Sequence, residues 1–498
     1  MYNETSWDEA ELILANARQA FRELKKYSIR QRASFMRTIA VEIEALGDEL
    51  IKTAMAETNL TEPRLIGERA RTILQWNSYA NYAELGNWMD VRIDTASRTL
   101  SKTDIRKTAV ALGPVAVFGA GNFPFAFSTA GGDTASAIAA GCPVVVKAHP
   151  GHPKTCVLMA QAIEKARVKC RMPEGVFAQV YSTGIEIGQL LVKHEVIKAV
   201  AFTGSFKGGK AIADLAAQRH EPIPVFAEMG SINPVFLLPE KLRMEAAQVA
   251  DQFIASVTLG VGQFCTNPGL MVGIAGDDLN TFTAALKNAA VNAAPATMLH
   301  PGIAQNFEHT RSNALQQSEV TVLAQSGIAK AENQGDATIA SVSAATFIAN
   351  PALHQEVFGP YSLLVVCQNA DEMLAVAEAI EGQLTATFIA TSNDLAENQT
   401  LTQIVQERCG RIIVNQFPTG VEVCLAMHHG GPYPATTNSA HTSVGADGIK
   451  RFTRPLSFQN WPNEHLPEEL QNANPLEVWR TINNELTLEP IGQPVAGY

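Results

Sequence analysis

The stretches that decide the fold are four short apolar runs between residues 115 and 204: VAVFG (115–119), PVVVKA (143–148), VFAQVY (176–181) and IKAVAFTG (197–204). They are rich in β-branched residues and nearly continuous in apolar side chains, which is typical of strands buried on both faces. The segments between them, such as 126–140 and 155–168, have the length and composition of helices. Strands that alternate with helices in this way predict a doubly wound parallel α/β sheet.

A second region with the same alternation begins near residue 234. The helices predicted there are 243–256, 279–291 and 370–379. The predicted strands are 235–238, 271–276, 346–349, 362–366, 387–390 and 411–415. We therefore expect a second α/β domain, which makes the chain an α/β protein with two doubly wound domains.

The ends of the chain differ from this core. The first ninety residues are predicted to be helical, because Ser6 and Glu9 have capping-box spacing and Ser28 precedes a second run of helical periodicity. Residues 90–107 resemble a polar hairpin whose edge can pair with another subunit. From His428 onward the chain is rich in Gly, Pro, Thr and Asn, so we expect irregular loops, one strand and subunit contacts there.

Composition excludes several classes of protein. The 498 residues include 38 Lys and Arg against 49 Asp and Glu, a net charge of −11, and 46% are hydrophobic. Such a chain can bury large cores, and its acidic balance without a basic stripe argues against a nucleic-acid partner. No basic patch precedes an apolar run near the N-terminus, and no stretch reaches about 18 uninterrupted apolar residues. We expect a soluble, unexported protein without membrane contact.

The cysteines point to a reducing compartment. The seven positions are 142, 156, 170, 265, 367, 409 and 424. They show neither CxxC pairs nor zinc-ligand spacing, so reduced thiols in a cytoplasm fit best. Most such cysteines are small buried hydrophobes. Cys265 lies in the polar, glycine-bearing loop 262–266, where a thiol is better placed to react, although a buried structural cysteine is the alternative.

A glycine turn follows the last strand of the first region. Gly204 and Ser205 lead from strand 197–204 into the helical run 210–218. Backbone N–H groups at such a turn can hold a pyrophosphate, or the turn simply joins a strand to a helix. No G-x-G-x-x-G follows a predicted strand, so the standard dinucleotide fingerprint is missing.

Two further polar residues follow strand-like stretches. Asn122 lies past the carboxyl end of strand 115–119, the edge where open α/β sheets bind ligands, but a turn residue is the alternative. Glu228 lies between a strand-like PVFA and Gly230. It either enters a cleft or is an ordinary surface carboxylate.

Taken together, these residues resemble the aldehyde dehydrogenase superfamily. The motifs that carry the resemblance occur in the family's order: Asn-Phe-Pro (122–124), VVVK ending at Lys147, FTGS (202–205), Glu-Met-Gly (228–230), Gly-Gln-x-Cys (262–265) and EVFGP (356–360). Within the family, the stretches 126–134, 415–424 and 429–437 resemble the branch of α-ketoglutarate semialdehyde dehydrogenases and an NADP-dependent fatty aldehyde dehydrogenase.

The resemblance implies a covalent mechanism. Cys265 matches the nucleophile that attacks the aldehyde, and the Asn122 side chain with the Cys265 backbone N–H matches the oxyanion hole. Glu228 matches the general base that activates the hydrolytic water.

The resemblance also implies a cofactor site. Lys147 would contact the adenosine ribose, Gly204 and Ser205 the pyrophosphate, and Glu356 with Phe358 the nicotinamide ribose and ring. Many NAD-specific members carry Glu three positions after this lysine, where this chain has Pro150. We therefore expect NADP, with NAD also usable, although Ile185 and Glu186 offer no arginine for the 2′-phosphate.

The sequence also bears on the substrate tunnel and on metal binding. We expect five residues to line the aldehyde tunnel: Phe127, Phe264, Thr266, Phe417 and Thr419. The alternative for the aromatic residues is packing in the core, where aromatic side chains are more often found. His149 and His152 flank Pro150 and Gly151, which prevents a helical metal face, and we expect no metal site. His428 and His429 are predicted to point apart as loop histidines near the mouth of the site.

The implied domains are 1–89 with 110–233 for NAD(P), 234–439 for catalysis, and 90–109 with 440–498 for oligomerisation, in a homodimer or homotetramer. The expected activity is oxidation of α-ketoglutarate semialdehyde, with a fatty or broad-specificity aldehyde dehydrogenase as the alternative. A thiol hydrolase in which a histidine serves Cys265 remains a second class, since spatial pairing is not visible in sequence. A catalytically silent relative is disfavoured, because Cys265, Glu228 and Asn122 are all present.

Overall fold

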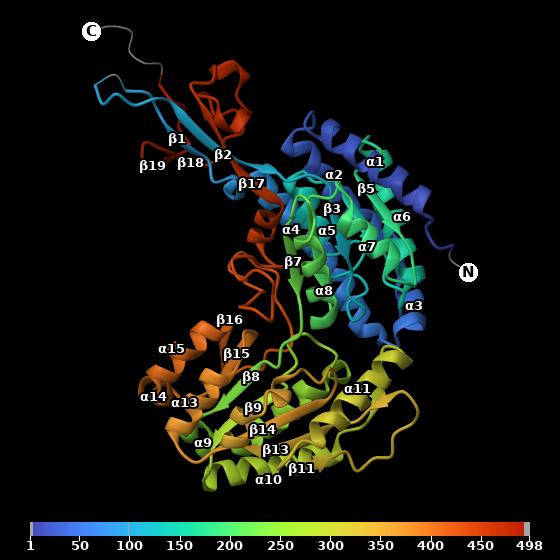
Figure 1. Cartoon of the computed structure of the whole chain (residues 1–498), viewed down its shortest axis with the longest axis vertical. Helices are drawn as coiled ribbons and strands as arrows, with labels where there is room; N and C mark the ends of the chain where they lie inside the picture. Colours follow the sequence, from blue (N-terminus) through green and yellow to red (C-terminus); the bar gives the residue numbers. More distant parts are fainter. Residues whose placement is uncertain (1–2, 98, 493–498) are drawn as a thin grey trace.

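The computed structural model describes residues 3–97 and 99–492. Three multi-stranded sheets organise it, two of them mainly parallel and covered by helices, and a third that projects from one end (Figure 1). The N-terminal helices are α1 (Trp7–Leu24), α2 (Ile29–Ala45), α3 (Gly47–Thr58) and α4 (Glu62–Leu85), followed by η1 (Asn87–Met89). Ser6 and Ser28 form the capping boxes of α1 and α2, which confirms both predicted helix starts.

The first sheet is wholly parallel, with the order β5-β4-β3-β6-β7. Its strands are β3 (Val115–Phe118), β4 (Val144–Lys147), β5 (Phe177–Val180), β6 (Ala199–Thr203) and β7 (Val225–Glu228). Its crossover helices are α5 (Gly132–Ala140), α6 (Pro153–Lys169), α7 (Glu186–Lys193) and α8 (Phe206–Ala217). The strand order reverses between β3 and β6, so the carboxyl ends of these two strands form the ligand-binding crevice of the sheet.

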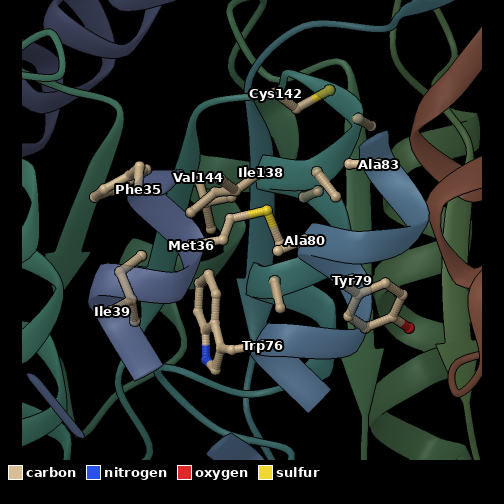
Figure 2. Packing of buried hydrophobic residues seen from close by; sticks show 14 of the residues in the cluster. Phe35, Met36, Ile39, Trp76, Tyr79, Ala80, Ala83, Ile138, Cys142 and Val144 are labelled. Atoms are coloured by element: carbon tan, nitrogen blue, oxygen red, sulfur yellow. The ribbon is translucent and has the colours of Figure 1, made fainter. Parts of the chain in front are cut away.

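The predicted helix over 126–140 is half right. Residues 124–131 form turns, and α5 begins only at Gly132. Gly131 and Gly132 pack too closely for side chains, since a Cβ on either would lie within 2.6 Å of Ala126 O or of the Gln75 side chain. The turn leaves the residues after Asn122 at the sheet edge. Figure 2 shows the core behind it, where Trp76, Met36 and Ile138 from α4, α2 and α5 pack together.

The second sheet has seven strands in the order β11-β13-β14-β9-β8-β15-β16. The strands are β8 (Pro234–Leu237), β9 (Leu270–Ile274), β11 (Thr321–Gln325), β13 (Thr338–Ser343), β14 (Tyr361–Cys367), β15 (Gln383–Ile389) and β16 (Cys409–Val414). All pairs are parallel except β11 with β13. Five of the six predicted strands are confirmed.

The elements between these strands complete the second α/β unit. They are α9 (Pro239–Thr258), η2 (Leu259–Gly262), α10 (Asp277–Asn292), α11 (Pro301–Leu315), α12 (Ala344–Ala349), η3 (Pro351–His354), α13 (Ala370–Ala379), α14 (Ser392–Glu397) and α15 (Gln399–Arg408), with the short pair β10 (Ala296–Thr297) and β12 (Gln334–Gly335). The strand predicted over 346–349 is wrong, because it lies inside α12. The Ser343 side chain accepts the Thr346 N–H as an N-cap and begins the helix there, and the strand is β13 just before it.

The third sheet has the order β17-β2-β1-β18-β19 and projects beside the first (Figure 1). Its strands are β1 (Arg92–Asp94), β2 (Ile105–Ala111), β17 (Thr453–Gln459), β18 (Arg480–Ile482) and β19 (Glu485–Thr487), with η4 (Ala446–Phe452), η5 (Asn463–His465) and η6 (Glu468–Leu470) beside them. The predicted hairpin is confirmed, since Arg92 pairs with Lys107 in an antiparallel register.

The prediction of one strand after His428 is wrong, because β17, β18 and β19 all lie there. Asn483 and Asn484 both have positive φ (49° and 73°) in the two-residue turn between β18 and β19. This backbone favours tight hairpins and tolerates asparagine, so the Asn-Asn pair was the overlooked signal. Residue 98, inside the predicted oligomerisation segment 90–109, and residues 493–498, at the end of the segment 440–498, lie outside the described residues. Within the described residues, no helix combines the length and apolar character needed to cross a membrane.

Candidate active site

The site lies where the two large sheets meet. Asn122 follows β3, Glu228 ends β7, and Cys265 lies in the loop between η2 and β9. His429 comes from the long connection between β16 and η4. Four segments far apart in the chain therefore converge on one place.

Cys265, His429 and Glu228 are in mutual contact. Cys265 Sγ lies 3.7 Å from His429 Nε2, and that nitrogen donates to Glu228 Oε1 at 2.9 Å. Ser443 Oγ donates to Glu228 Oε2 at 2.7 Å, so both carboxylate oxygens are occupied. The side chains of Glu228 and His429 are almost fully buried. One potential ligand atom of each of the three residues lies within 4.8 Å of the others.

The surroundings set the resting protonation of this trio. Burial raises the pKa of the Cys265 thiol well above its usual range, and the neighbouring Glu228 carboxylate raises it further. Burial by itself would raise the pKa of Glu228 too, but His429 and the hydrogen bond from Ser443 hold it below its ordinary value. A neutral thiol beside an ionised carboxylate follows, which is the arrangement in which the carboxylate can accept the thiol proton.

The loop that carries Cys265 is conformationally constrained. Gly260, Val261 and Gly262 have φ of 54°, 59° and 65°, and a left-handed backbone is unusual for a β-branched residue such as Val261. A Cβ on Gly262 would lie 2.3 Å from the Gly359 carbonyl carbon, so the two family motifs touch through backbone. Asn233 Nδ2 donates to the Cys265 carbonyl at 2.9 Å. The loop thereby fixes the thiol in front of the crevice.

Asn122 faces the same loop from the opposite side. Its Nδ2 donates to the Gln263 carbonyl at 3.0 Å, two residues before the cysteine. The turn that follows it is held by Glu68 of α4, whose Oε1 accepts the N–H groups of Phe125 and Ala126, both at 2.9 Å. Helix α4 thus positions the segment that presents the Asn122 amide to the cysteine loop.

The residues predicted for the adenosine and pyrophosphate lie at the carboxyl edge of the first sheet. Lys147 ends β4, and burial lowers its pKa. Ser205 caps α8 by accepting the Gly208 N–H at 3.3 Å. A Cβ on Gly204 would lie 2.7 Å from the Phe202 ring, so a glycine is needed at this position. The exposed N-terminus of α8 is therefore not covered by a side chain from residue 204. Pro150 is exposed beyond β4. A helix N-terminus at a switch point fits a dinucleotide phosphate.

Glu356 and Phe358 line a small pocket with Ser231 and Gly262, on the Cys265 side of the crevice. A Cβ on Gly230 would lie 2.6 Å from Glu356 Oε2, so the carboxyl group packs directly over the Glu-Met-Gly motif. Burial raises the pKa of Glu356 to about 8. The structure therefore brings together all six predicted motifs.

The predicted tunnel residues divide into two groups. Phe127 is buried with its ring centroid 6.3 Å from that of His429, and Phe264 packs edge-on against Phe123 at 5.6 Å. Thr266, the residue that follows Cys265 in the sequence, is buried. Phe417 packs instead on Phe253 of α9 at 5.5 Å, and Thr419 Oγ1 lies 2.5 Å from Ser256 Oγ of the same helix. These last two hold the connection after β16 against the second sheet's helices.

The sequence-based prediction for His429 is wrong about where this side chain lies. His429 was expected at the mouth of the site, yet it is buried between Cys265 and Glu228. His149 and His152 stack with ring centroids 5.0 Å apart, and His152 Nδ1 lies 3.2 Å from Cys156 Sγ, away from the trio. Ser443 and Arg71 were not predicted at all. Only the position of His429 in the motif HGGPYP, 164 residues after Cys265, hinted at a role.

The fold and this site define an α/β enzyme with a candidate cysteine nucleophile beside the ligand-binding crevice of a parallel sheet. The chain belongs to the aldehyde dehydrogenase family, whose model matches residues 2–455. Its members are oxidoreductases that act on aldehydes and use NAD(P). The predicted family resemblance and the predicted α/β fold are confirmed.

Two relatives are similar over most of their length. "Alpha-ketoglutaric semialdehyde dehydrogenase 2" from Azospirillum brasilense is 47% identical over 467 residues, 93% of this chain and 89% of the relative. "Alpha-ketoglutaric semialdehyde dehydrogenase" from Acinetobacter baylyi is 41% identical over 491 residues, 98% and 93% of the two chains.

Solved structures share the fold at lower identity. A 3,6-anhydro-L-galactose dehydrogenase in complex with NAP is 23% identical with a TM-score of 0.77, and the match covers 92% of each chain. A succinic semialdehyde dehydrogenase from Streptococcus pyogenes in complex with NADP+ is 16% identical with a TM-score of 0.76, covering 92% of this chain and 96% of that one.

Proposed function

We propose that the chain oxidises α-ketoglutaric semialdehyde to α-ketoglutarate with NADP, and that NAD also serves. The names and high coverage of the Azospirillum and Acinetobacter relatives support this substrate. The single observation that carries the chemistry is the contact of Cys265, His429 and Glu228, because it places a nucleophile beside a proton acceptor. A fatty or broad-specificity aldehyde dehydrogenase is the alternative substrate class.

The first half of the reaction is attack by Cys265. Its sulfur bonds to the aldehyde carbon while the thiol proton passes directly to the Glu228 carboxylate, with which the thiol shares a hydrogen bond. The Asn122 amide and the Cys265 backbone N–H donate to the oxyanion, and one such donor contributes about 3 to 4 kcal/mol. A nicotinamide held by Glu356 and Phe358 would supply the hydride acceptor for that carbon, and Cys265 would then carry the acyl group as a thioester.

The second half is hydrolysis of this thioester. Glu228 accepts a proton from a water molecule as the water attacks the acyl carbon. The bond to Cys265 Sγ then breaks, the thiolate takes up a proton, and the carboxylic acid leaves. His429 orients the Glu228 carboxylate through the 2.9 Å hydrogen bond and so acts as a positioning residue in this half.

The cofactor preference rests on the end of β4. Pro150 offers no carboxylate to repel a 2′-phosphate, and Lys147 ends the same strand with a side chain that can pair with it. Gly204, Ser205, Glu356 and Phe358 are the other residues that we propose to hold the dinucleotide.

A thiol hydrolase is the competing class, and the contact between His429 and Cys265 supplies the histidine that it requires. A thiol hydrolase needs no dinucleotide, so it would not use the ligand-binding crevice at the carboxyl ends of β3 and β6. This crevice favours the dehydrogenase. Ester cleavage without any nicotinamide, measured alongside dehydrogenase turnover, separates the two classes. Ester turnover that exceeds aldehyde oxidation would overturn the proposal.

An aldehyde panel tests the proposal directly. Purified enzyme is assayed with α-ketoglutaric semialdehyde, succinic semialdehyde, benzaldehyde and long-chain alkanals, each with NAD and with NADP. We expect the highest kcat/KM for the first aldehyde with NADP. Cys265→Ala should abolish turnover while cofactor binding, followed by fluorescence, persists. A higher kcat/KM for alkanals would instead select the alternative substrate class.

We further propose that the predicted domains and oligomerisation segments act as such in a homodimer or homotetramer. The projecting third sheet and the outer edge of β16, which pairs with no further strand among the described residues and exposes Ile412 and Val414, support an assembly through strand edges.

A further inference from the structure

We propose that Arg71 is the carboxylate-recognising residue of the substrate site and therefore selects an aldehyde with an acidic group at its far end. This inference rests on the proposed function, because it deepens the substrate class of the same site. Its basis is a buried guanidinium group next to the cysteine site whose terminal nitrogens are unpaired.

Arg71 lies on the face of α4 that borders the site. Arg64, Glu68 and Arg71 are spaced at i, i+4 and i+7, so they share that face. Arg64 covers the Phe123 ring at 4.4 Å, and Glu68 bonds to the backbone after Asn122. Arg71 covers the Phe127 ring at 5.0 Å. This places the guanidinium group behind the ring that packs on His429.

The charge of Arg71 acts on the reacting group. The Arg71 guanidinium opposes the upward shift that burial and Glu228 cause in the Cys265 pKa, and Glu68 followed by Cys265 opposes the fall that burial causes in the Arg71 pKa. The two groups therefore share one electrostatic environment. A substrate whose aldehyde carbon sits at Cys265 would extend past Phe127, which lies against both His429 and Arg71, toward the guanidinium group.

The terminal nitrogens of Arg71 are available. Its Nε donates to the Val421 carbonyl at 3.3 Å, which fixes the plane of the group. Nη1 and Nη2 are buried and have no hydrogen-bond partner among the residues that the structure describes. An unpaired buried cation is costly in a folded protein unless a ligand or ordered water completes it. A guanidinium with two free terminal nitrogens is the group best matched to a bidentate carboxylate.

The other arginines near the site have terminal nitrogens bound within the protein. Arg64 Nη1 donates to Glu68 Oε2 at 2.8 Å. Arg411 donates Nη1 to Met427 Sδ at 3.8 Å and Nη2 to the carbonyls of Pro418 and Gly420 at 3.3 and 3.2 Å, so among the described residues only its Nε is buried without a partner. Both glutamate oxygens of Glu68 are also used, by Arg64 and by backbone N–H groups. Arg71 is therefore left to face the ligand.

The surrounding wall is apolar, as an aldehyde chain requires. Phe127, Ala126, Ala120 and Val444 form a small buried cluster, with Phe123, Val421, Val423 and Met427 packed against it. A single cation in an apolar wall distinguishes an acidic semialdehyde from an alkanal, because only the former offers a partner for the charge.

The decisive experiment compares two aldehydes in matched variants. We would measure kcat/KM for α-ketoglutaric semialdehyde and for pentanal, which has the same number of carbons but neither the carboxylate nor the 2-keto group, in wild type, Arg71→Met, Arg71→Lys and Arg411→Met. The ratio of the two values should fall at least about 100-fold in Arg71→Met, chiefly through KM, and be partly restored in Arg71→Lys. Arg411→Met should lower both values together and keep the ratio.

A binding readout separates this inference from the proposed function. α-Ketoglutarate should raise the melting temperature of the wild type but not of Arg71→Met, whatever the preferred aldehyde is. If the wild type oxidises the semialdehyde well but the ratio is unchanged in Arg71→Met, the Arg71 assignment is wrong and the function stands. If the wild type prefers pentanal, the proposed substrate is wrong, and equal melting shifts in both proteins would overturn the Arg71 assignment as well.

Discussion

The Cys265 thiol and its two neighbours decide the reactivity of the site. A buried, neutral thiol is a poor nucleophile, and the Glu228 carboxylate makes ionisation harder still. In the proposed mechanism the same carboxylate accepts the thiol proton, so the residue that suppresses the free thiolate would also enable the covalent step. His429 couples the two, since one nitrogen lies against both the sulfur and the carboxylate.

We expect Glu228→Gln to separate these two effects. Removing the charge should lower the Cys265 pKa, so the rate of iodoacetamide labelling should reach half its maximum at a lower pH than in wild type. Steady-state turnover should fall about 10² to 10⁴-fold, because hydrolysis of the thioester loses its base. Cys265→Ala controls for labelling at other cysteines. An unchanged labelling profile would show that the carboxylate does not act on the thiol.

Glu356 predicts a pH dependence of cofactor binding. Its raised pKa of about 8 means that the free protein holds the carboxyl group protonated at pH 7. Ribose hydroxyls donate best to the ionised form, so binding must release a proton below pH 8 and none above it. The dissociation constant for NADP should fall by up to about tenfold per pH unit towards pH 8 and then level off.

Fluorescence titration of NADP from pH 6 to 9 checks this slope. Glu356→Gln should abolish it. Glu469→Gln is the matched control, because Glu469 is another buried glutamate with a raised pKa but lies beside Thr108 in the third sheet. A slope that survives Glu356→Gln would assign the proton to another group.

At the scale of elements, the loop between η2 and β9 is as important as the residue it carries. Three left-handed residues at the end of η2 lead into this loop, and the backbone contact between Gly262 and Gly359 ties it to the EVFGP segment. The proposed nucleophile and the residues proposed to hold the nicotinamide are thereby on one rigid unit, as hydride transfer would require.

Gly262→Ala should disrupt this unit. The new methyl group would meet Gly359 backbone at 2.3 Å, whereas Gly47, with a similar φ of 56°, has no atom within 4 Å of its Cβ position. Gly47→Ala should therefore lose only about 1 to 2 kcal/mol of stability, from backbone strain alone. Gly262→Ala should lose more and also lose activity. Urea unfolding and kcat measure both, and equal losses in the two variants would exclude the contact as the cause.

Element prediction succeeded where local signals were strong. The buried strands of both sheets carry continuous apolar runs, and the Ser6 and Ser28 capping boxes mark helix starts without tertiary help. It failed over 346–349, where TFIA has strand composition but the Ser343 cap and the packing of Phe347 in the second core make a helix. Short apolar segments are ambiguous in this way because burial supports either structure.

At the scale of the whole molecule, the site depends on chain crossings. The chain leaves the first sheet after β7, builds the second sheet, and returns through the connection that carries His429 and Ser443 before β17 pairs with β2. The return brings Ser443 and His429 onto Glu228, which ends the last strand of the first sheet. Catalytic geometry thus depends on how the two sheets are held together.

The assembly should depend on the edge of the second sheet at β16. Among the described residues β16 pairs only with β15, and Ile412 and Val414 alternate on it as exposed apolar side chains. Ile412→Lys should weaken the dimerisation constant at least about tenfold by placing a charge in the interface. Val322→Lys, on the opposite edge strand β11, is the control and should leave assembly intact. Sedimentation velocity measures both, and a monomeric wild type would refute the assembly outright.

The sequence by itself determined the class of fold, the order of the family motifs and the identity of Cys265, Glu228 and Asn122 as candidates, because strand patterning and motif chemistry are local. Only the tertiary structure decided which residues meet. His429 joins the site from 164 residues away, Phe417 and Thr419 pack against α9, and the terminal nitrogens of Arg71 on α4 stay unpaired among the described residues. These outcomes depend on long-range packing and on the burial of charge, which no single stretch of sequence encodes.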